Sequence, residues 1–230
     1  MAYTIIDKFI PTSLYKLKAP FTMKPQYVTI HNTYNDASAL NEVAYMTRNA
    51  SPVSYHVAID DKYAVQAIPF TRNAWHAGDG NGPGNRKSIG IEICYSKSGG
   101  QRYKEAEANA IDYVAHVLKQ YGWGVDRVKW HRDWSGKDCP HRIFAEGRAQ
   151  SVKDRIAKRL AELNAPPKEE IRMFNPSSPT LKAAYEQFLT DAIHKGVLTD
   201  KWLKDYKAGK LSLDDALALK VIVDQREGNE

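Results

Sequence analysis

The run Ser88-Ile-Gly-Ile-Glu-Ile-Cys-Tyr95 constrains the fold of this 230-residue chain more than any other stretch. It is apolar almost throughout, which is typical of a strand whose two faces are both covered in the middle of a sheet. Glu92 interrupts the run, and a carboxylate in such a strand is costly unless it is paired or faces a cleft. We therefore expect a central strand that carries Glu92 into a functional site.

The sequence around this strand predicts a mixed α/β domain. Strands are expected over residues 27–31 and 125–131, and alternation over residues 54–60 and 63–68 predicts a hairpin. Apolar residues at helical spacing predict helices around residues 40–47, 103–121 and 145–163. Residues 1–26 contain three prolines and suggest an irregular lead-in, and residues 71–87 suggest a long loop. The expected fold is a central mixed β-sheet of about five strands flanked by helices.

The C-terminal quarter of the chain differs from the rest. The segment Asn164-Ala-Pro-Pro-Lys-Glu-Glu170 breaks the preceding helix, and three short helices are predicted after it. We expect a first domain over residues 1–163, a linker over 164–174 and a small all-α domain over 175–230. The second domain is too short for a rich active site, so the chemistry is expected in the first.

The stretch from Trp130 to His141 concentrates groups that can bind a metal. His131 and Cys139 are good zinc ligands when deprotonated, and Gly136 lets the segment between them fold back. His31 ends an expected strand and is the best candidate for a third ligand. Two histidines and one cysteine would leave a coordination position for water, as in catalytic zinc sites. On these residues alone, a loop with an unrelated histidine and a buried thiol is the favoured interpretation.

Charge and composition narrow the possible partners. Lysine plus arginine exceed aspartate plus glutamate by 23 to 16 over residues 1–164, whereas residues 165–230 carry 10 against 11. A basic first domain suits an anionic polymer, but its basic residues are scattered, so a nucleic-acid interface is not expected.

No apolar run has the length of a membrane span, so membrane insertion is not expected. The N-terminus lacks the pattern of a signal peptide, and a disulfide between Cys94 and Cys139 is not expected.

Five motifs occur in one order along the chain. They are Ile30-His31-Asn32-Thr33, Ser54-Tyr-His-Val-Ala-Ile-Asp60, Ala74-Trp-His-Ala-Gly78, Asn85-Arg-Lys-Ser-Ile-Gly-Ile-Glu92 and His131-Arg-Asp-Trp-Ser-Gly-Lys-Asp-Cys-Pro140. Together they resemble the zinc-dependent N-acetylmuramoyl-L-alanine amidases, the family of bacteriophage amidase endolysins and bacterial autolysins that is related to the peptidoglycan recognition proteins. The resemblance covers roughly residues 20–160.

The resemblance implies a set of site residues and a reaction. A Zn²⁺ ion would be held by His31, His131 and Cys139, and the substrate would be the amide between N-acetylmuramic acid and L-alanine in bacterial peptidoglycan. Both a glutamate and a tyrosine serve in branches of the family, and this chain has a match for each. The implied catalytic residues are Glu92 as general base, Tyr55 as hydrogen-bond donor and Lys137 for the oxyanion, and the substrate-binding candidates are Asn32, Trp75 and His76.

The resemblance also implies partners and a setting. The second domain would bind the cell wall, through wall teichoic acid or a secondary wall polymer; docking or dimerisation is the alternative. An endolysin of this kind is made in the host cytoplasm and reaches the wall when a holin permeabilises the membrane. Three other functions remain open: a non-catalytic peptidoglycan-binding module, a cysteine hydrolase using Cys139 with His131, and a structural zinc site completed by His76 or His141. Recognition proteins that bind without cutting lack the zinc cysteine, which is present here.

Overall fold

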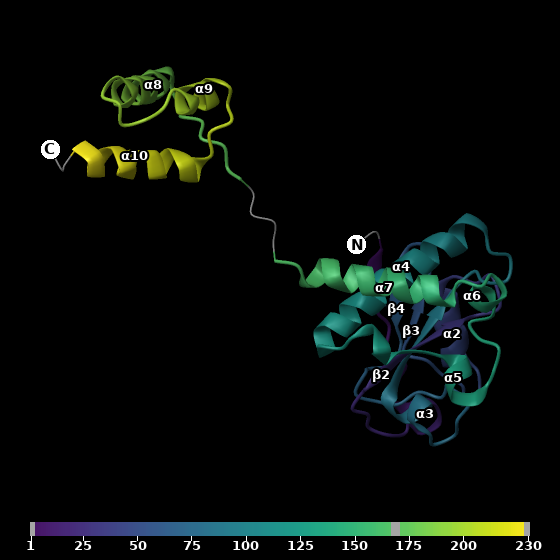
Figure 1. Cartoon of the computed structure of the whole chain (residues 1–230). Coiled ribbons are helices and arrows are strands. Elements are labelled where there is room, and N and C mark those ends of the chain that lie inside the picture. The colour runs from purple at the N-terminus through teal and green to yellow at the C-terminus, as the bar shows by residue number, and fades with distance from the viewer. Residues whose placement is uncertain (1–2, 167–170, 228–230) are drawn as a thin grey trace. The chain divides into compact units, whose positions relative to one another are not determined.

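The computed structural model describes residues 3–166 and 171–227, and the chain divides into two compact units, Met1–Ala165 and Pro166–Glu230 (Figure 1). Part of the expected linker, residues 167–170, lies outside the described residues, as do the first two residues of the N-terminus. Each unit has its own apolar core.

The first unit is built on a six-stranded mixed sheet in the order β1-β4-β3-β5-β2-β6. Only the β3–β4 hairpin is antiparallel, and all other neighbours run parallel. The central position expected for the apolar run is confirmed, because β5 lies between β3 and β2. The strands are β1 (Thr4–Asp7), β2 (Tyr27–Asn32), β3 (Val57–Ile59), β4 (Tyr63–Gln66), β5 (Ser88–Ile93) and β6 (Val128–Trp130).

Helices cover this sheet and complete the core of the first unit. Helix α4 (Gly100–Tyr121) packs on β3, β4 and β5, and α7 (Ala149–Asn164) packs on α4, while α2 (Ala39–Arg48) contacts β3 and β4 (Figure 1). The expected mixed sheet flanked by helices is therefore confirmed. The shorter helices are η1 (Thr12–Leu14), α1 (Tyr15–Lys18), α3 (Pro83–Lys87), η2 (Val125–Arg127), α5 (His131–Ser135) and α6 (His141–Ala145).

Single residues determine where two of these helices begin or end. The Ser38 hydroxyl accepts a hydrogen bond from the Asn41 backbone N–H and caps α2, as side chains of this type do at helix N-termini. Gly122 ends α4 in the left-handed conformation, with φ of 65°.

Several local predictions were wrong. Residues 1–26 are not an irregular lead-in, since β1 adds to the sheet beside β4 and two short helices follow. The expected loop over residues 71–87 ends in α3, and the helix expected over residues 145–163 begins only at Ala149, as α7, after the separate short helix α6. His131 does not end a strand, because β6 stops at Trp130 and His131 begins α5. These differences shift the bounds of elements but leave the fold class unchanged.

The second unit consists of the three expected helices, α8 (Pro179–His194), α9 (Lys201–Lys207) and α10 (Leu213–Glu227). The Ser178 hydroxyl caps α8 by accepting from the Leu181 N–H. Its small core is Leu189, Leu211, Ala216 and Leu219, with aromatic rings packed around it. Within the described ranges of the chain, no helix combines the length and apolar character needed to cross a bilayer.

Candidate metal centre and catalytic cleft

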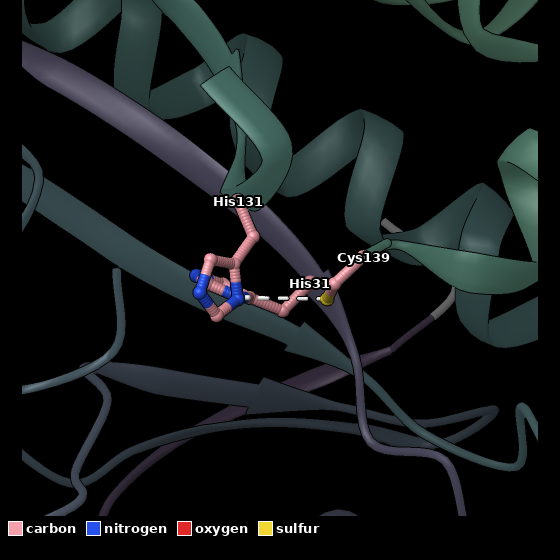
Figure 2. A group of neighbouring side chains, drawn as sticks. All are labelled: His31, His131 and Cys139. Atoms are coloured by element: carbon pink, nitrogen blue, oxygen red, sulfur yellow. Dashed lines mark hydrogen bonds between the residues drawn. The ribbon is translucent and has the colours of Figure 1, made fainter. Parts of the chain in front are cut away.

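Two imidazoles and one thiol converge near the ends of β2 and β6 (Figure 2). His31 Nδ1 lies 3.0 Å from His131 Nδ1 and 3.7 Å from Cys139 Sγ. One ligand atom from each residue lies within 4.8 Å of the others, and all three residues are buried. Over the described residues, this is the one group of His, Cys, Asp and Glu side chains found with such spacing. The structure thus brings together the three residues that the sequence singled out as metal-binding candidates, and their role stays a prediction.

The local fold explains how residues 100 positions apart come together. Ile30 of β2 pairs with Trp130 of the parallel strand β6, so the residues that follow them emerge side by side. The Asp133 carboxylate accepts from the Trp130 backbone N–H and starts α5. Gly136 ends that helix with φ of 76°, and the Arg132 N–H then donates to the Cys139 carbonyl. The chain thus turns back and presents Cys139 to His31.

Burial keeps the two imidazoles neutral. Desolvation lowers the pKa of His131 to about 4, helped by the charge of Lys137, and lowers the pKa of His31 well below its usual value. Neutral imidazoles are the form that binds metal. Burial, followed by the Glu92 charge, raises the pKa of the Cys139 thiol to about 12. A thiol of this kind is not an activated nucleophile, which weighs against the cysteine-hydrolase alternative.

A cleft of about 700 Å³ is lined by His31, His131 and Cys139. Glu92, Tyr55 and Lys137, the predicted catalytic residues, all line it. Glu92 Oε2 and the Tyr55 hydroxyl are buried and have no hydrogen-bond partner among the described residues. Burial, with a contribution from Glu42, raises the pKa of Glu92 to about 8, whereas Lys137 acts in the opposite direction. Buried polar atoms without partners are rare in folded proteins, so these two are free to meet a ligand.

The three predicted substrate-binding residues are placed differently from one another. Asn32 lines the cleft, but its Oδ1 accepts from the Arg142 N–H at 3.1 Å and its Nδ2 faces the Tyr103 hydroxyl. Trp75 is not among the described residues that line the cleft, and its ring packs edge-on against Phe21. His76 also lines the cleft, and its Nδ1 is hydrogen-bonded to His31 Nε2 at 3.0 Å. Their roles stay predictions.

Glu42 is a cleft residue that the sequence did not reveal. It lies in the first turn of α2, next to the apolar stripe, where an acidic side chain normally faces solvent. Here it is buried, lines the cleft, and has one carboxylate oxygen without a hydrogen-bond partner in the described part of the chain. Desolvation raises its pKa. No sequence signal separates it from an ordinary helix-surface glutamate, since only the packing of α2 beside β3 buries it.

Comparisons with known proteins agree with this site. A family model described as N-acetylmuramoyl-L-alanine amidase matches residues 21–142, more than half of the chain. The amidases CwlA and XlyB of Bacillus subtilis are 58% and 57% identical over 164 and 161 residues, which cover 71% and 70% of this chain. The chain spans 60% and 51% of the length of these two relatives.

Two solved structures resemble the first unit. The structure of PlyL is 56% identical with a TM-score of 0.65, and covers 66% of this chain and 96% of that one. The PlyG catalytic domain is 52% identical with a TM-score of 0.66, and covers 71% of this chain and 99% of that one. These matches confirm the resemblance drawn from the five motifs, and the chain belongs to the N-acetylmuramoyl-L-alanine amidase family.

Proposed function

We propose that this protein is a zinc-dependent peptidoglycan amidase that hydrolyses the bond between the lactyl group of N-acetylmuramic acid and L-alanine. One observation carries the proposal. In a chain of this family, His31, His131 and Cys139 converge at a cleft beside Glu92, a carboxylate with an oxygen that lacks a hydrogen-bond partner among the described residues. The names of the relatives point to the same reaction.

The three side chains suit a zinc ion. Histidine nitrogen and cysteine sulfur are its preferred donors, and three protein ligands are the usual number at a catalytic site. A bound zinc would lower the pKa of water to roughly 7 and polarise the amide carbonyl. The alternative of a structural zinc needs a fourth protein ligand. His76 uses both ring nitrogens elsewhere, and His141 directs Nε2 to the Ser96 carbonyl at 3.4 Å, which favours an open fourth position.

Three cleft residues supply the remaining chemistry. Glu92 takes the proton from the attacking water and returns it to the leaving amine of L-alanine, because a carboxyl with a raised pKa can do both near neutral pH. The Tyr55 hydroxyl, which keeps its proton because burial raises its pKa well above the usual value, donates to the developing oxyanion. Lys137 adds a positive charge at the same cleft.

The second unit is proposed to hold the enzyme on the wall. A groove of about 620 Å³ lies on it, lined by Phe174, Tyr206, Lys182 and Lys207 among others. Aromatic rings beside lysines suit an anionic wall polymer such as teichoic acid, since rings pack against sugars and ammonium groups pair with phosphate. With a wall-directed unit, the role of a phage endolysin that depends on a holin fits the chain.

The test is a product analysis on purified Gram-positive cell walls. The proposal predicts turbidity loss with new L-alanine amino termini and no new reducing sugars. Activity should be lost with a chelator and regained with zinc. Reducing ends would indicate a glycosidase instead, and lysis that ignores the chelator would contradict the metal-dependent reaction. Absence of cleavage by a protein that still binds walls would support the alternative of a non-catalytic binding module.

A further inference from the structure

A line of buried hydrogen bonds leads away from the metal centre into the sheet. His31 Nε2 lies 3.0 Å from His76 Nδ1, and His76 Nε2 lies 3.2 Å from the backbone carbonyl of Ser88. We propose that His76 is a positioning residue that fixes the tautomer of the neutral His31 ring. The hydrogen is then on Nε2 of His31, and Nδ1 has a free lone pair to bind the metal. This inference rests on the proposed function, because it concerns the same metal centre.

The direction of each bond follows from chemistry. The Ser88 carbonyl can only accept, so the hydrogen of His76 must be on Nε2. His76 and His31 are 6% and 1% exposed, and a charged imidazole at either place would be costly, so each ring carries one proton. His76 Nδ1 is then an acceptor, and the hydrogen of His31 must be on Nε2. His31 Nδ1, which faces His131 and Cys139, keeps its lone pair.

The surroundings of His76 hold its ring in this orientation. Asn85 Oδ1 accepts from the backbone N–H groups of His76 and Ala77, at 2.7 and 2.8 Å. The ring packs against the backbone of β5 at Gly90, where a Cβ atom would come within 2.7 Å of it. Gly90 is therefore required because it lets the His76 ring lie close to the backbone of β5, and not because of a special backbone conformation.

This placement argues against a role for His76 in binding the substrate or the metal directly. Both of its ring nitrogens are occupied, by His31 and by the Ser88 carbonyl, so neither is directed to a substrate or to the metal. Partners of this kind orient a metal-binding histidine and typically contribute 10-fold to 100-fold in metal affinity. We therefore expect His76 to act through His31.

The first experiment reads the protonation directly. Long-range proton–nitrogen NMR spectra of the metal-free, full-length protein distinguish which ring nitrogen of a neutral histidine carries hydrogen. The expected result is hydrogen on Nε2 of both His31 and His76. Hydrogen on Nδ1 of His31 would overturn the proposal. This measurement requires neither metal nor activity.

The second experiment compares two variants of His76. His76→Leu fills similar space but removes the acceptor, whereas His76→Asn keeps an oxygen at the position of Nδ1. Zinc affinity is measured by competition with a chelating dye, and NMR fingerprints check the fold. We expect a 10-fold to 100-fold weaker affinity for His76→Leu and partial recovery for His76→Asn. Equal affinities of the two variants, whether normal or reduced, would overturn the proposal.

Gly90→Ala provides an independent test, because it displaces the ring without changing its chemistry. It should weaken zinc binding in the same direction as His76→Leu. Unchanged zinc affinity in a variant whose His76 ring has moved would contradict the proposal. If the wild-type protein binds zinc but cleaves no peptidoglycan, the proposed reaction fails while the role of His76 stands. If it binds no zinc, both the metal-dependent reaction and the proposed role of His76 are overturned.

Discussion

The two units of this protein treat polar side chains in opposite ways. The first unit buries histidines, carboxylates and even an ammonium group, including Lys18, His56 and Glu107. In the second unit, every described residue in the buried class is apolar, from Leu189 to Val223. Buried polar groups require partners and reduce stability when a partner is lost. The first unit therefore contains polar groups that lower its stability but can serve chemistry, whereas the buried residues of the second unit serve only its folding.

Lys18 shows what that burial involves. Its ammonium group is fully buried and donates to Asn49 Oδ1 at 2.9 Å and to the carbonyls of Ser51 and Val53. These acceptors belong to the segment after α2, which lines the cleft. Burial lowers the pKa of Lys18. The cleft wall therefore depends on a side chain of the N-terminal segment, far from the site in sequence.

The largest expected effect comes from removing a metal ligand. Cys139→Ala should reduce wall hydrolysis by about a thousandfold or more, because the contribution of a metal to the transition state amounts to several kcal/mol. Retention on cell walls should be unchanged if binding resides in the second unit. Release of L-alanine amino termini and sedimentation with walls measure the two properties separately. A variant that loses both equally would break the proposed division between the units.

A somewhat smaller loss is expected at Glu92. Glu92→Gln keeps the shape of the side chain but cannot accept a proton, so hydrolysis should fall by about 10²-fold to 10⁴-fold. Zinc affinity should change little, since Glu92 is not among the three ligand residues. A control at the exposed Glu105 of α4, Glu105→Gln, should leave hydrolysis unchanged. Near-normal hydrolysis by Glu92→Gln would assign the main catalytic role to Tyr55.

Acid should destabilise the first unit more than the second. Burial lowers the pKa of His56 to about 4 and that of His76 to about 3. Below about pH 6.5 these histidines become protonated in the unfolded chain but not in the folded unit. Their full contribution to the free energy of unfolding is therefore present above that pH, and it is lost as the pH drops toward 4. The His56 shift alone corresponds to on the order of 3 kcal/mol. His194, the histidine of the second unit, is exposed.

Urea unfolding of the metal-free protein at pH 7 and pH 4.5, followed by NMR signals from each unit, measures this difference. The free energy of unfolding of the first unit should fall between the two pH values, while that of the second unit should change much less. Equal losses in the two units would show that the buried histidines do not control acid stability.

The smallest effect concerns the groove of the second unit. Lys182→Glu reverses a charge at the groove and should weaken sedimentation with teichoic-acid-containing walls several-fold, mainly at low salt. Lys220→Glu on α10, at an exposed position not among the groove residues, is the matched control. If both variants bind equally well, the groove is not the wall-binding surface. Walls stripped of teichoic acid should remove the difference between them.

Sequence patterns predicted the parts of the fold that have strong periodicity. The apolar run of β5 and the helical stripe of α4 could be placed within a few residues, because buried elements of regular structure leave a clear pattern. Strand β1 was missed because it is a four-residue edge strand with mostly exposed side chains. An edge strand with one neighbour shows little alternation, so only the pairing with β4 reveals it.

The site residues that could be predicted are those that lie within one of the five motifs. His31, His131 and Cys139 stand in motifs, and the structure places them together. Glu42 was not found, because its burial depends on how α2 packs rather than on local sequence. Trp75 adjoins His76 in the same motif, yet only His76 lines the cleft, because consecutive residues in an extended loop point in different directions.

A zinc titration of the metal-free protein, with release of L-alanine amino termini as the readout, tests whether hydrolysis depends on the metal. We expect no hydrolysis without metal, a linear rise with added zinc, and a plateau at one zinc ion per chain. Cys139→Ala should show neither the rise nor the plateau. Full hydrolysis by the metal-free protein would contradict the central claim, as would a chain that binds one zinc ion tightly and remains inactive.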